Sequence, residues 1–144
     1  GYGDRRSENA MNVRLACDRD AAFLAAHDQH IAREELEYAL ARRRVYLAEE
    51  RGAPVGWLRF NLFWDNTPFC NLLFVSEQNR GAGVGSALLG AWERDMRAAG
   101  YAAVMTSTQA EERAQEFYRA RGYRDAGGFF PYGEGYELIL IKKL

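Results

Sequence analysis

The sequence has few cysteines, little net charge and no long apolar run, and each shortage excludes a class of protein. Its two cysteines, Cys17 and Cys70, lack the spacing of a metal or disulfide framework, which indicates a reduced compartment. The formal charge of -1 gives no general attraction to nucleic acid or anionic membranes. No apolar run approaches the roughly 20 residues of a membrane span, and the polar start has no secretory signal. We therefore expect a cytoplasmic protein without nucleic-acid or membrane partners.

The composition is that of an ordinary globular protein, with 48% hydrophobic and 27% charged residues in a chain of 144. We expect residues 11–144 to form a single domain, preceded by a flexible tail at residues 1–10. His27 and His30 have a spacing that can bind metal from one helical face. No third ligand is apparent, so no metal site is predicted.

Hydrophobic periodicity predicts a mixed α/β fold. Strands are expected at 11–16, 44–50, 55–64, 69–75, 102–107 and 136–144, and helices at 19–27, 31–43, 84–99 and from Thr108 to Arg121. Three consecutive strands over 44–75 favour an antiparallel meander, whereas strand, helix and strand over 69–107 predict a parallel crossover. On the helix over 84–99, Glu93 and Arg97 are spaced as an ion pair on the outer face.

The helix ends carry recognisable signals. Asp18 is predicted to N-cap the first helix, and Thr108 with Glu111 has the spacing of a capping box before the last one. Gly100 and Gly122 are placed to end two helices in the left-handed region.

A glycine-rich loop carries the strongest functional signal. Gly81, Gly83 and Gly85 follow Arg80, between an apolar strand and an amphipathic helix. The start of a helix leaves backbone N–H groups unpaired and carries partial positive charge, and glycines let that backbone approach an anion. Arg80 adds a delocalised cation. The pattern predicts a phosphate or pyrophosphate site.

Two common phosphate-binding patterns fit this loop poorly. A P-loop requires a lysine after its glycines, and no lysine follows here. A dinucleotide fingerprint requires a third glycine where this chain has Ser86, and an acidic residue at the end of the next strand, where this chain has 105–107 (MTS). Nucleotide binding is therefore the weakest hypothesis for the ligand of this loop.

The run Arg80-Gly81-Ala82-Gly83-Val84-Gly85 resembles the pyrophosphate loop R/Q-x-x-G-x-G/A of the GNAT superfamily of acetyltransferases. A second segment, AQEFYRARGY at 114–123, resembles the family motif A-x-x-F-Y-x-x-x-G-F/Y, and the order of predicted elements is similar over nearly the whole chain. The resemblance implies a mostly antiparallel twisted sheet with a central parallel strand pair and helices on both faces.

The resemblance also implies acetyl-CoA as the cosubstrate, with its pantetheine arm along the end of the fourth strand. The implied cofactor-binding residues are Phe74, Val75, Arg80, Gly81, Ala82, Gly83, Val84, Gly85, Ser86 and Tyr118. Many relatives bind the arm with an asparagine seven residues before the tyrosine, where this chain has Glu111. The capping-box role accounts for Glu111 without any cofactor.

The resemblance assigns catalysis to Tyr118, as the acid that protonates the departing sulfur. The backbone N–H of Val75 is expected to stabilise the oxyanion. Asp65, Glu77 and a bound water are alternatives for the general base. The chain has no GxSxG elbow and no local base beside either cysteine, so direct transfer is expected.

The acceptor is expected to be a primary amine of a small molecule or peptide. Aromatic residues in segments that could line its pocket, most of them expected to pack in the core, are Trp57, Phe63, Trp64, Phe129, Phe130 and Tyr132. A non-catalytic acyl-CoA-binding or sensing module is the alternative function. The resemblance to the family is the only support for a possible homodimer through the C-terminal strands.

Overall fold

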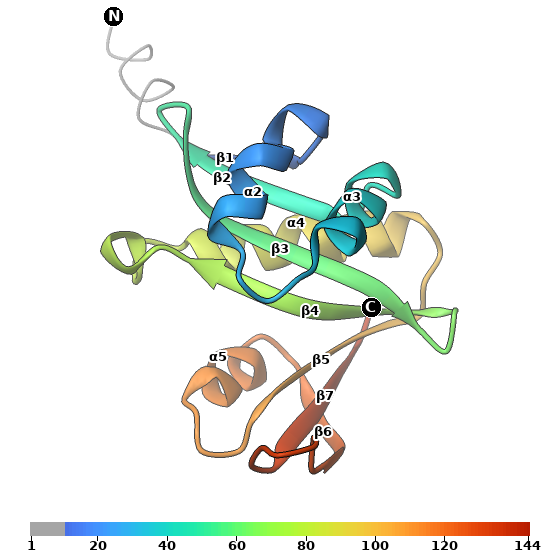
Figure 1. Cartoon of the computed structure of the whole chain (residues 1–144). Coiled ribbons are helices and arrows are strands. Elements are labelled where there is room, and N and C mark those ends of the chain that lie inside the picture. The colour runs from blue at the N-terminus through green and yellow to red at the C-terminus, as the bar shows by residue number, and fades with distance from the viewer. Residues whose placement is uncertain (1–10) are drawn as a thin grey trace, which may run out of the picture. The chain divides into compact units, whose positions relative to one another are not determined.

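Seven strands form one hydrogen-bonded sheet in the order β1-β2-β3-β4-β5-β7-β6 (Figure 1). The computed structural model describes residues 11–144, so the tail expected at residues 1–10 lies outside the described part. The strands are β1 (Met11–Leu15), β2 (Val45–Glu50), β3 (Ala53–Phe63), β4 (Thr67–Val75), β5 (Ala103–Gln109), β6 (Arg124–Phe129) and β7 (Glu137–Lys143). The helices are η1 (Asp18–Asp20), α2 (Ala21–His27), α3 (Arg33–Ala41), η2 (Glu77–Asn79), α4 (Val84–Ala98) and α5 (Ala114–Ala120).

The pairing of the strands confirms the predicted mixed fold. β1 with β2, β2 with β3, β5 with β7 and β6 with β7 are antiparallel. β4 and β5 are parallel, with Phe69 opposite Met105 and Cys70 opposite Thr106. Since α4 connects these two strands, residues 67–109 form the crossover unit that the sequence predicts. The strand β6 is an addition to the predicted elements.

The described chain divides into two compact units. The first contains the described residues up to Phe60 together with Leu72–Trp92, and the second contains Asn61–Asn71 and Glu93–Leu144. The glycine-rich loop therefore belongs to the first unit, and α5 with Tyr118 belongs to the second. The prediction of a single domain over 11–144 stays a prediction.

The core of the first unit packs against both faces of β3. On one face, Trp57 joins a buried cluster formed largely by side chains of α2, α3 and β2. On the other face, Phe60 contacts Trp92 of α4, with ring centroids 5.8 Å apart. Figure 1 shows α2 and α3 in front of β3 and α4 behind it. Helices therefore cover both faces of the sheet in this unit, as predicted.

Asp18 is not the N-cap of the first helix, because a short 3-10 turn, η1, begins at this residue. The polar contacts come from Asp20, whose carboxylate accepts the backbone N–H of Cys17 at 2.8 Å. The same carboxylate receives two hydrogen bonds of 2.8 Å from the guanidinium of Arg14, which also bonds Glu49. The Arg14 guanidinium lowers the pKa of Asp20 to about 2.

The predicted surface pair of Glu93 and Arg97 is wrong. Glu93 is 8% exposed. Its carboxylate accepts the hydroxyl of Tyr123 and the ammonium group of Lys142, each at 2.8 Å, whereas Arg97 is exposed. A buried carboxylate needs strong donors, and those of α5–β6 and β7 outcompete an i,i+4 partner in water.

The predicted capping box of Thr108 and Glu111 is also wrong. Thr108 lies within β5 and is buried, and α5 begins only at Ala114 with no side-chain cap. The side-chain amide of Gln115 instead donates to the carbonyl of Ala110 at 2.7 Å and so closes the turn before α5. Spacing alone did not show that β5 continues through the threonine.

The glycine stops are confirmed at both predicted helix ends. Gly100 and Gly122 have φ of 95° and 94°. After α4, the N–H of Tyr101 bonds the carbonyl of Met96 at 3.1 Å, and after α5 the N–H of Tyr123 bonds the carbonyl of Tyr118 at 3.1 Å. These bonds are those of a Schellman motif, which requires a left-handed residue.

Within residues 11–144 no helix is long and apolar enough to cross a membrane. In the same residues, Cys17 and Cys70 form no disulfide. The cytoplasmic location stays a prediction.

Gly56 of β3 lies in a crowded part of the first unit. A Cβ at this position would lie 2.7 Å from the carbonyl oxygen of Phe74, 3.0 Å from Val84 and 3.3 Å from Leu88. Only a residue without a side chain lets β3 approach both the end of β4 and the start of α4 so closely.

We expect Gly56→Ala to lower the free energy of unfolding by about 1–3 kcal/mol, the range for forced overpacking against backbone. Gly52→Ala is the matched control, because Gly52 has φ of +78° and nothing within 4 Å of an added Cβ. That variant meets backbone strain alone, about 1 kcal/mol. Urea unfolding measures both, and a smaller loss for Gly56→Ala than for the control would contradict the packing argument.

Asp20→Asn should lower the free energy of unfolding at pH 7 by about 1–2 kcal/mol, since part of the pair with Arg14 is solvated. The folded pKa of Asp20, about 2, lies below its ordinary value of 3.8. The stabilisation is therefore complete above that ordinary value and is lost as the pH falls through the folded one. Urea unfolding at pH 7 and pH 2 checks this, with the exposed Asp18→Asn as control. A difference that persists at pH 2 would refute the assignment.

Candidate functional site

The glycine-rich loop connects β4 to α4 within the first unit. Gly81 and Gly83 have φ of 82° and 84°, a backbone region that other residues rarely adopt. An added Cβ would meet nothing within 4 Å at either position, so conformation rather than crowding requires glycine. The N–H of Ala87 bonds the carbonyl of Gly83 at 3.0 Å. The amides of Val84 and Gly85 therefore precede the first hydrogen-bonded turn of α4.

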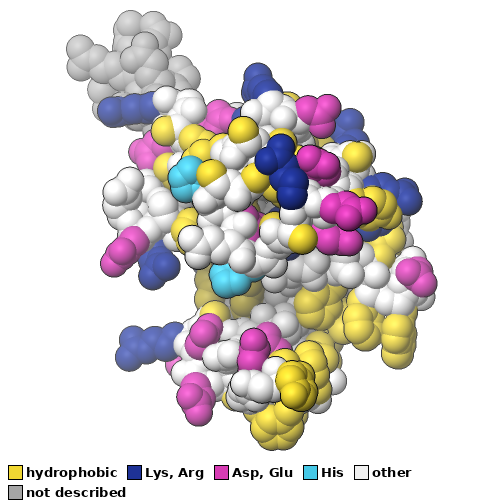
Figure 2. All heavy atoms as spheres, in the orientation of Figure 1, with side chains coloured by type: hydrophobic (Ala, Val, Ile, Leu, Met, Phe, Trp, Pro, Cys, Tyr) yellow, Lys and Arg dark blue, Asp and Glu magenta, His cyan; other side chains and the backbone are white. Residues whose placement is uncertain are grey.

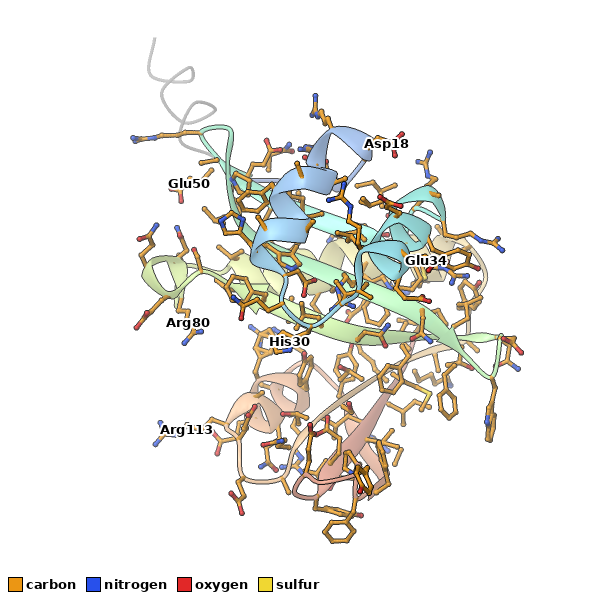
Figure 3. All side chains as sticks on the ribbon, viewed as in Figure 1. Asp18, His30, Glu34, Glu50, Arg80 and Arg113 are labelled. Atoms are coloured by element: carbon orange, nitrogen blue, oxygen red, sulfur yellow. The ribbon has the colours of Figure 1, made fainter. Side chains whose placement is uncertain are left out.

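Polar contacts that local sequence patterns did not reveal hold this loop in place. The hydroxyl of Ser76 bonds the side chain of Asn79, whose amide group donates to the carboxylate of Glu50 at 3.1 Å. Glu50 ends β2, so the loop is fastened to the neighbouring end of the sheet (Figure 3). An asparagine three residues after a serine signals only a local turn. Nothing local indicates a partner 29 residues away.

Arg80 extends from the exposed part of the loop (Figure 3). Its Nε lies 3.5 Å from the carbonyl oxygen of Val75, which is a weak contact. Within residues 11–144, no carboxylate forms a salt bridge with this guanidinium. The charge next to the start of α4 is therefore available to an anion.

At the end of β4, the backbone groups of Phe74 and Ser76 face β3. The N–H of Ser76 donates to the carbonyl of Val55 in β3 at 2.9 Å, and the carbonyl of Phe74 also faces β3 at Gly56. Successive residues of a strand direct their backbone groups to opposite sides. The N–H and C=O of Val75 therefore point away from β3, on the side where Arg80 reaches that carbonyl.

Tyr118 lies in the second unit, on α5, and is 6% exposed. Burial raises the pKa of its hydroxyl above the ordinary value of 10.0, and the neighbouring Cys70 adds to the rise, while a hydrogen bond with Thr106 opposes it. Thr106 and Cys70 are opposite each other in the parallel β4–β5 pair, and the threonine hydroxyl donates to the Cys70 carbonyl at 3.1 Å. Tyr118 is thus held protonated beside the pair of Cys70 and Thr106. Among the described residues, β4 and β5 are paired at this position and at the neighbouring pair of Phe69 and Met105.

The candidate bases lie in exposed turns. Asp65 belongs to the turn between β3 and β4 with φ of 63°, and Glu77 begins η2. Both carboxylates are exposed. His27 ends α2, whereas His30 lies beyond it, so they do not share a helical face. Among residues 11–144, no group of three metal-binding side chains is found.

The aromatic residues divide differently from the expectation. Trp57 is in the core, but Trp64 is 80% exposed, and Phe129, Phe130 and Tyr132 are exposed as well. In Figure 2 hydrophobic side chains gather at the end of the second unit where β6 turns into β7. Core packing therefore does not explain these four side chains.

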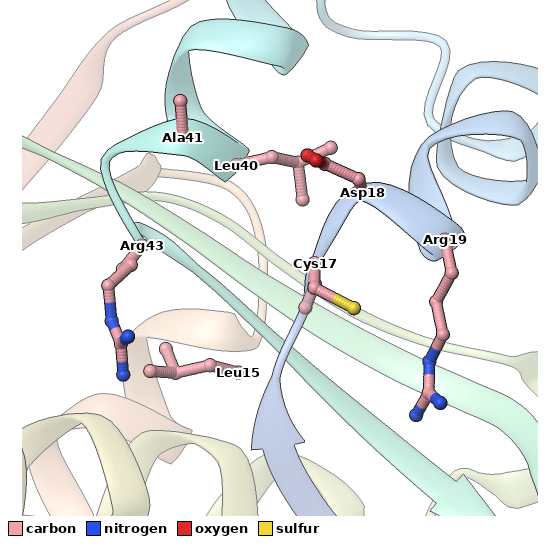
Figure 4. Close-up of a pocket in the computed structure, with 8 residues that line it drawn as sticks. Leu15, Cys17, Asp18, Arg19, Leu40, Ala41 and Arg43 are labelled. Carbon is pink, nitrogen blue, oxygen red and sulfur yellow. The ribbon is translucent and has the colours of Figure 1, made fainter.

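A cavity of about 710 Å³ opens elsewhere in the first unit (Figure 4). Its lining includes Cys17, Asp18 and the basic side chains of Arg19 and Arg43. It lies beside the start of β2, whereas the glycine-rich loop is fastened at Glu50, where β2 ends. Six residues of extended strand separate the two by roughly 17 Å. The cavity is thus no part of the predicted cofactor site.

Solved structures share this fold at low sequence identity. A GNAT acetyltransferase from Bacillus cereus is 23% identical, with a TM-score of 0.76 over 93% of this chain and 97% of that chain. Arabidopsis thaliana Naa50, in complex with a bisubstrate analogue, is 16% identical, with a TM-score of 0.79 over 93% and 99%. N-acetylglutamate synthase from Neisseria gonorrhoeae, complexed with coenzyme A and N-acetylglutamate, is 21% identical, with a TM-score of 0.77 over 94% and 35%.

No curated protein matches the sequence significantly. A model of the acetyltransferase (GNAT) family matches residues 12–123, which include the loop and the segment around Tyr118. The chain belongs to the GNAT family of acetyltransferases.

Proposed function

We propose that this protein moves the acetyl group of acetyl-CoA directly onto a primary amine of a small molecule or peptide. The observation that carries the proposal is the end of β4 with its glycine-rich loop. There an open helix start, an uncommitted guanidinium and an outward-facing backbone amide occur within a few residues of one another. Two of the similar structures were solved with coenzyme A or a bisubstrate analogue containing it, and both have this fold.

The loop supplies the groups that a diphosphate requires. The amides before the first turn of α4 offer hydrogen-bond donors, and the aligned peptides of this 15-residue helix add positive charge at its start. The left-handed conformations of Gly81 and Gly83 keep that surface open. Arg80 adds a charge that no carboxylate of the described residues neutralises. Phe74, Ala82 and Ser86 belong to the same proposed contact surface.

The end of β4 supplies the groups that a thioester requires. When bound, acetyl-CoA provides an activated acetyl group and a thiol leaving group. The N–H of Val75 points away from β3, so it can donate to the carbonyl oxygen as negative charge develops there. Alternating backbone groups of an unpaired strand edge also suit the amides of a pantetheine arm.

Tyr118 is proposed to donate a proton to the departing sulfur. Its raised pKa keeps the hydroxyl protonated at neutral pH, so that a proton is available to the sulfur. The base that deprotonates the amine is proposed to be a bound water, because Asp65 and Glu77 are solvated turn residues.

A non-catalytic acyl-CoA-binding or sensing module is the second candidate. The exposed position of both candidate bases favours it, since neither carboxylate is placed in a dry pocket. The two candidates share the cofactor site and differ in whether any amine is acetylated. The homodimer stays a prediction.

Arg80→Ala should weaken coenzyme A binding by about 1–3 kcal/mol, the range for losing a charge-assisted contact. Titration calorimetry with acetyl-CoA, coenzyme A and ATP measures the effect and tests the preference for coenzyme A. Arg19→Ala is the matched control, because this arginine lines the cavity near the start of β2. An affinity unchanged by Arg80→Ala would show that the guanidinium does not contact the phosphates.

Tyr118→Phe should lower turnover by about 10²–10⁴-fold, the usual contribution of a positioned acid, while acetyl-CoA binding persists. Thiol release measured across a library of amines gives the turnover, and calorimetry gives the binding. Tyr136→Phe serves as a control on an exposed tyrosine. Unchanged turnover would remove the proposed role of Tyr118. Tight binding without acetylation of any amine would favour the sensing module.

A further inference from the structure

A buried ion pair joins α2 to β3 in the first unit. Nε of Arg59 lies 2.6 Å from Oδ2 of Asp28, and the two side chains are 6% and 0% exposed. The residues are 31 positions apart in sequence. A buried ion pair seldom adds stability over an apolar pair of the same size, so its presence points to a requirement for geometry.

The carboxylate of Asp28 accepts donors from three residues in two segments, β3 and the α2–α3 connection. Oδ2 also accepts the indole N–H of Trp57 at 3.3 Å. Oδ1 accepts the backbone N–H of His30 at 3.1 Å and lies 3.4 Å from Nη2 of Arg59. Asp28 immediately follows α2, and its backbone is extended. One side chain therefore fixes both the end of α2 and the first residues of the α2–α3 connection on β3.

The same network reaches the proposed site of the thioester. The ring of Trp57 packs on Phe74 with centroids 4.4 Å apart, and Phe74 precedes Val75 at the end of β4. Trp57 and Phe74 lie on the face of the sheet that α2 and α3 cover. The start of α4, which is proposed to hold the diphosphate, packs on the opposite face at Gly56. Figure 1 shows the α2–α3 connection crossing in front of β3.

We propose that Asp28 is a positioning residue for the amine acceptor. With Arg59 and Trp57, it holds the α2–α3 connection on the face of the sheet opposite the proposed diphosphate site, and the proposal places the approach of the amine on that face. The diphosphate loop is fastened by separate contacts of Ser76 and Asn79. Loss of the Asp28–Arg59 pair, with Trp57 still packed on Phe74, is therefore expected to affect the acceptor and to leave the cofactor bound. This inference rests on the proposed acetyl transfer.

The test uses the double variant Asp28→Asn/Arg59→Met, which removes both charges together and leaves no unpaired ion in the core. The asparagine oxygen still accepts one of the remaining N–H donors. Arg33→Met/Glu37→Gln is the matched control, because it removes the exposed pair Arg33–Glu37 of α3. Asp28→Glu, which keeps the charge, is the conservative variant. Thermal unfolding identifies the temperature range in which every variant is folded.

In that range, hydrogen exchange of the peptide spanning 28–32 should quicken at least tenfold in the double variant and remain unchanged in the control. The KM for the amine should rise about tenfold, measured with spermidine, L-glutamate and a peptide with a free amino terminus, whereas the Kd for acetyl-CoA should stay within about twofold. Asp28→Glu should recover part of the amine KM.

Unchanged exchange, or an amine KM equal to that of the wild type, would overturn the positioning role. An equal loss of acetyl-CoA affinity would do the same, because it would show a general structural effect. A wild-type protein that ignores acetyl-CoA, or acetylates no amine of the panel, would instead count against the proposed function. The exchange result would then still decide whether Asp28 fixes the connection.

Discussion

The end of β4 is bonded on one side and open on the other, and the proposed chemistry depends on this asymmetry. On the side of β3, the carbonyl of Phe74 faces Gly56, and the N–H of Ser76 donates to the carbonyl of Val55. Gly56 also lies close to Val84 and Leu88 of α4, so β3, β4 and α4 meet closely there. The Val75 amide, between the groups of Phe74 and Ser76, points away from β3. Preorganised donors of this kind stabilise developing charge without the reorganisation that water requires.

Buried charge connects segments that hydrophobic packing alone would leave free to shift. Asp28 fixes the α2–α3 connection on Arg59, and Glu93 connects α4 to Tyr123 and Lys142. Each of these carboxylates would be costly to bury alone, so each constrains its donors in distance and direction. Apolar burial is non-directional, whereas these hydrogen-bonded pairs depend on direction. These pairs therefore fix the end of α2 on β3, and fix α4 relative to β7 and the start of β6.

The sequence predicted local geometry well and long-range partners poorly, for one physical reason. Glycine stops such as Gly100 and the glycines of the loop depend on a residue's own backbone, so spacing is enough to find them. The Glu93–Arg97 pair failed because a buried carboxylate chooses its partners across the fold. The capping box of Thr108 failed because β5 extends two residues beyond its predicted end. Asp28 gave no signal, since an aspartate near a helix end is ordinarily a surface residue.

The environment of Tyr118 also restricts how a proton can be delivered. Burial that raises the pKa of the hydroxyl makes it a weaker acid than the thiol it would regenerate, whose ordinary pKa is about 8.5. A complete early transfer is therefore uphill. A thiolate leaving beside Tyr118, as proposed, would also be more basic in dry surroundings, because burial penalises both anions. The two shifts oppose each other, so for the proposed transfer we expect the proton to move as the carbon–sulfur bond breaks rather than before it.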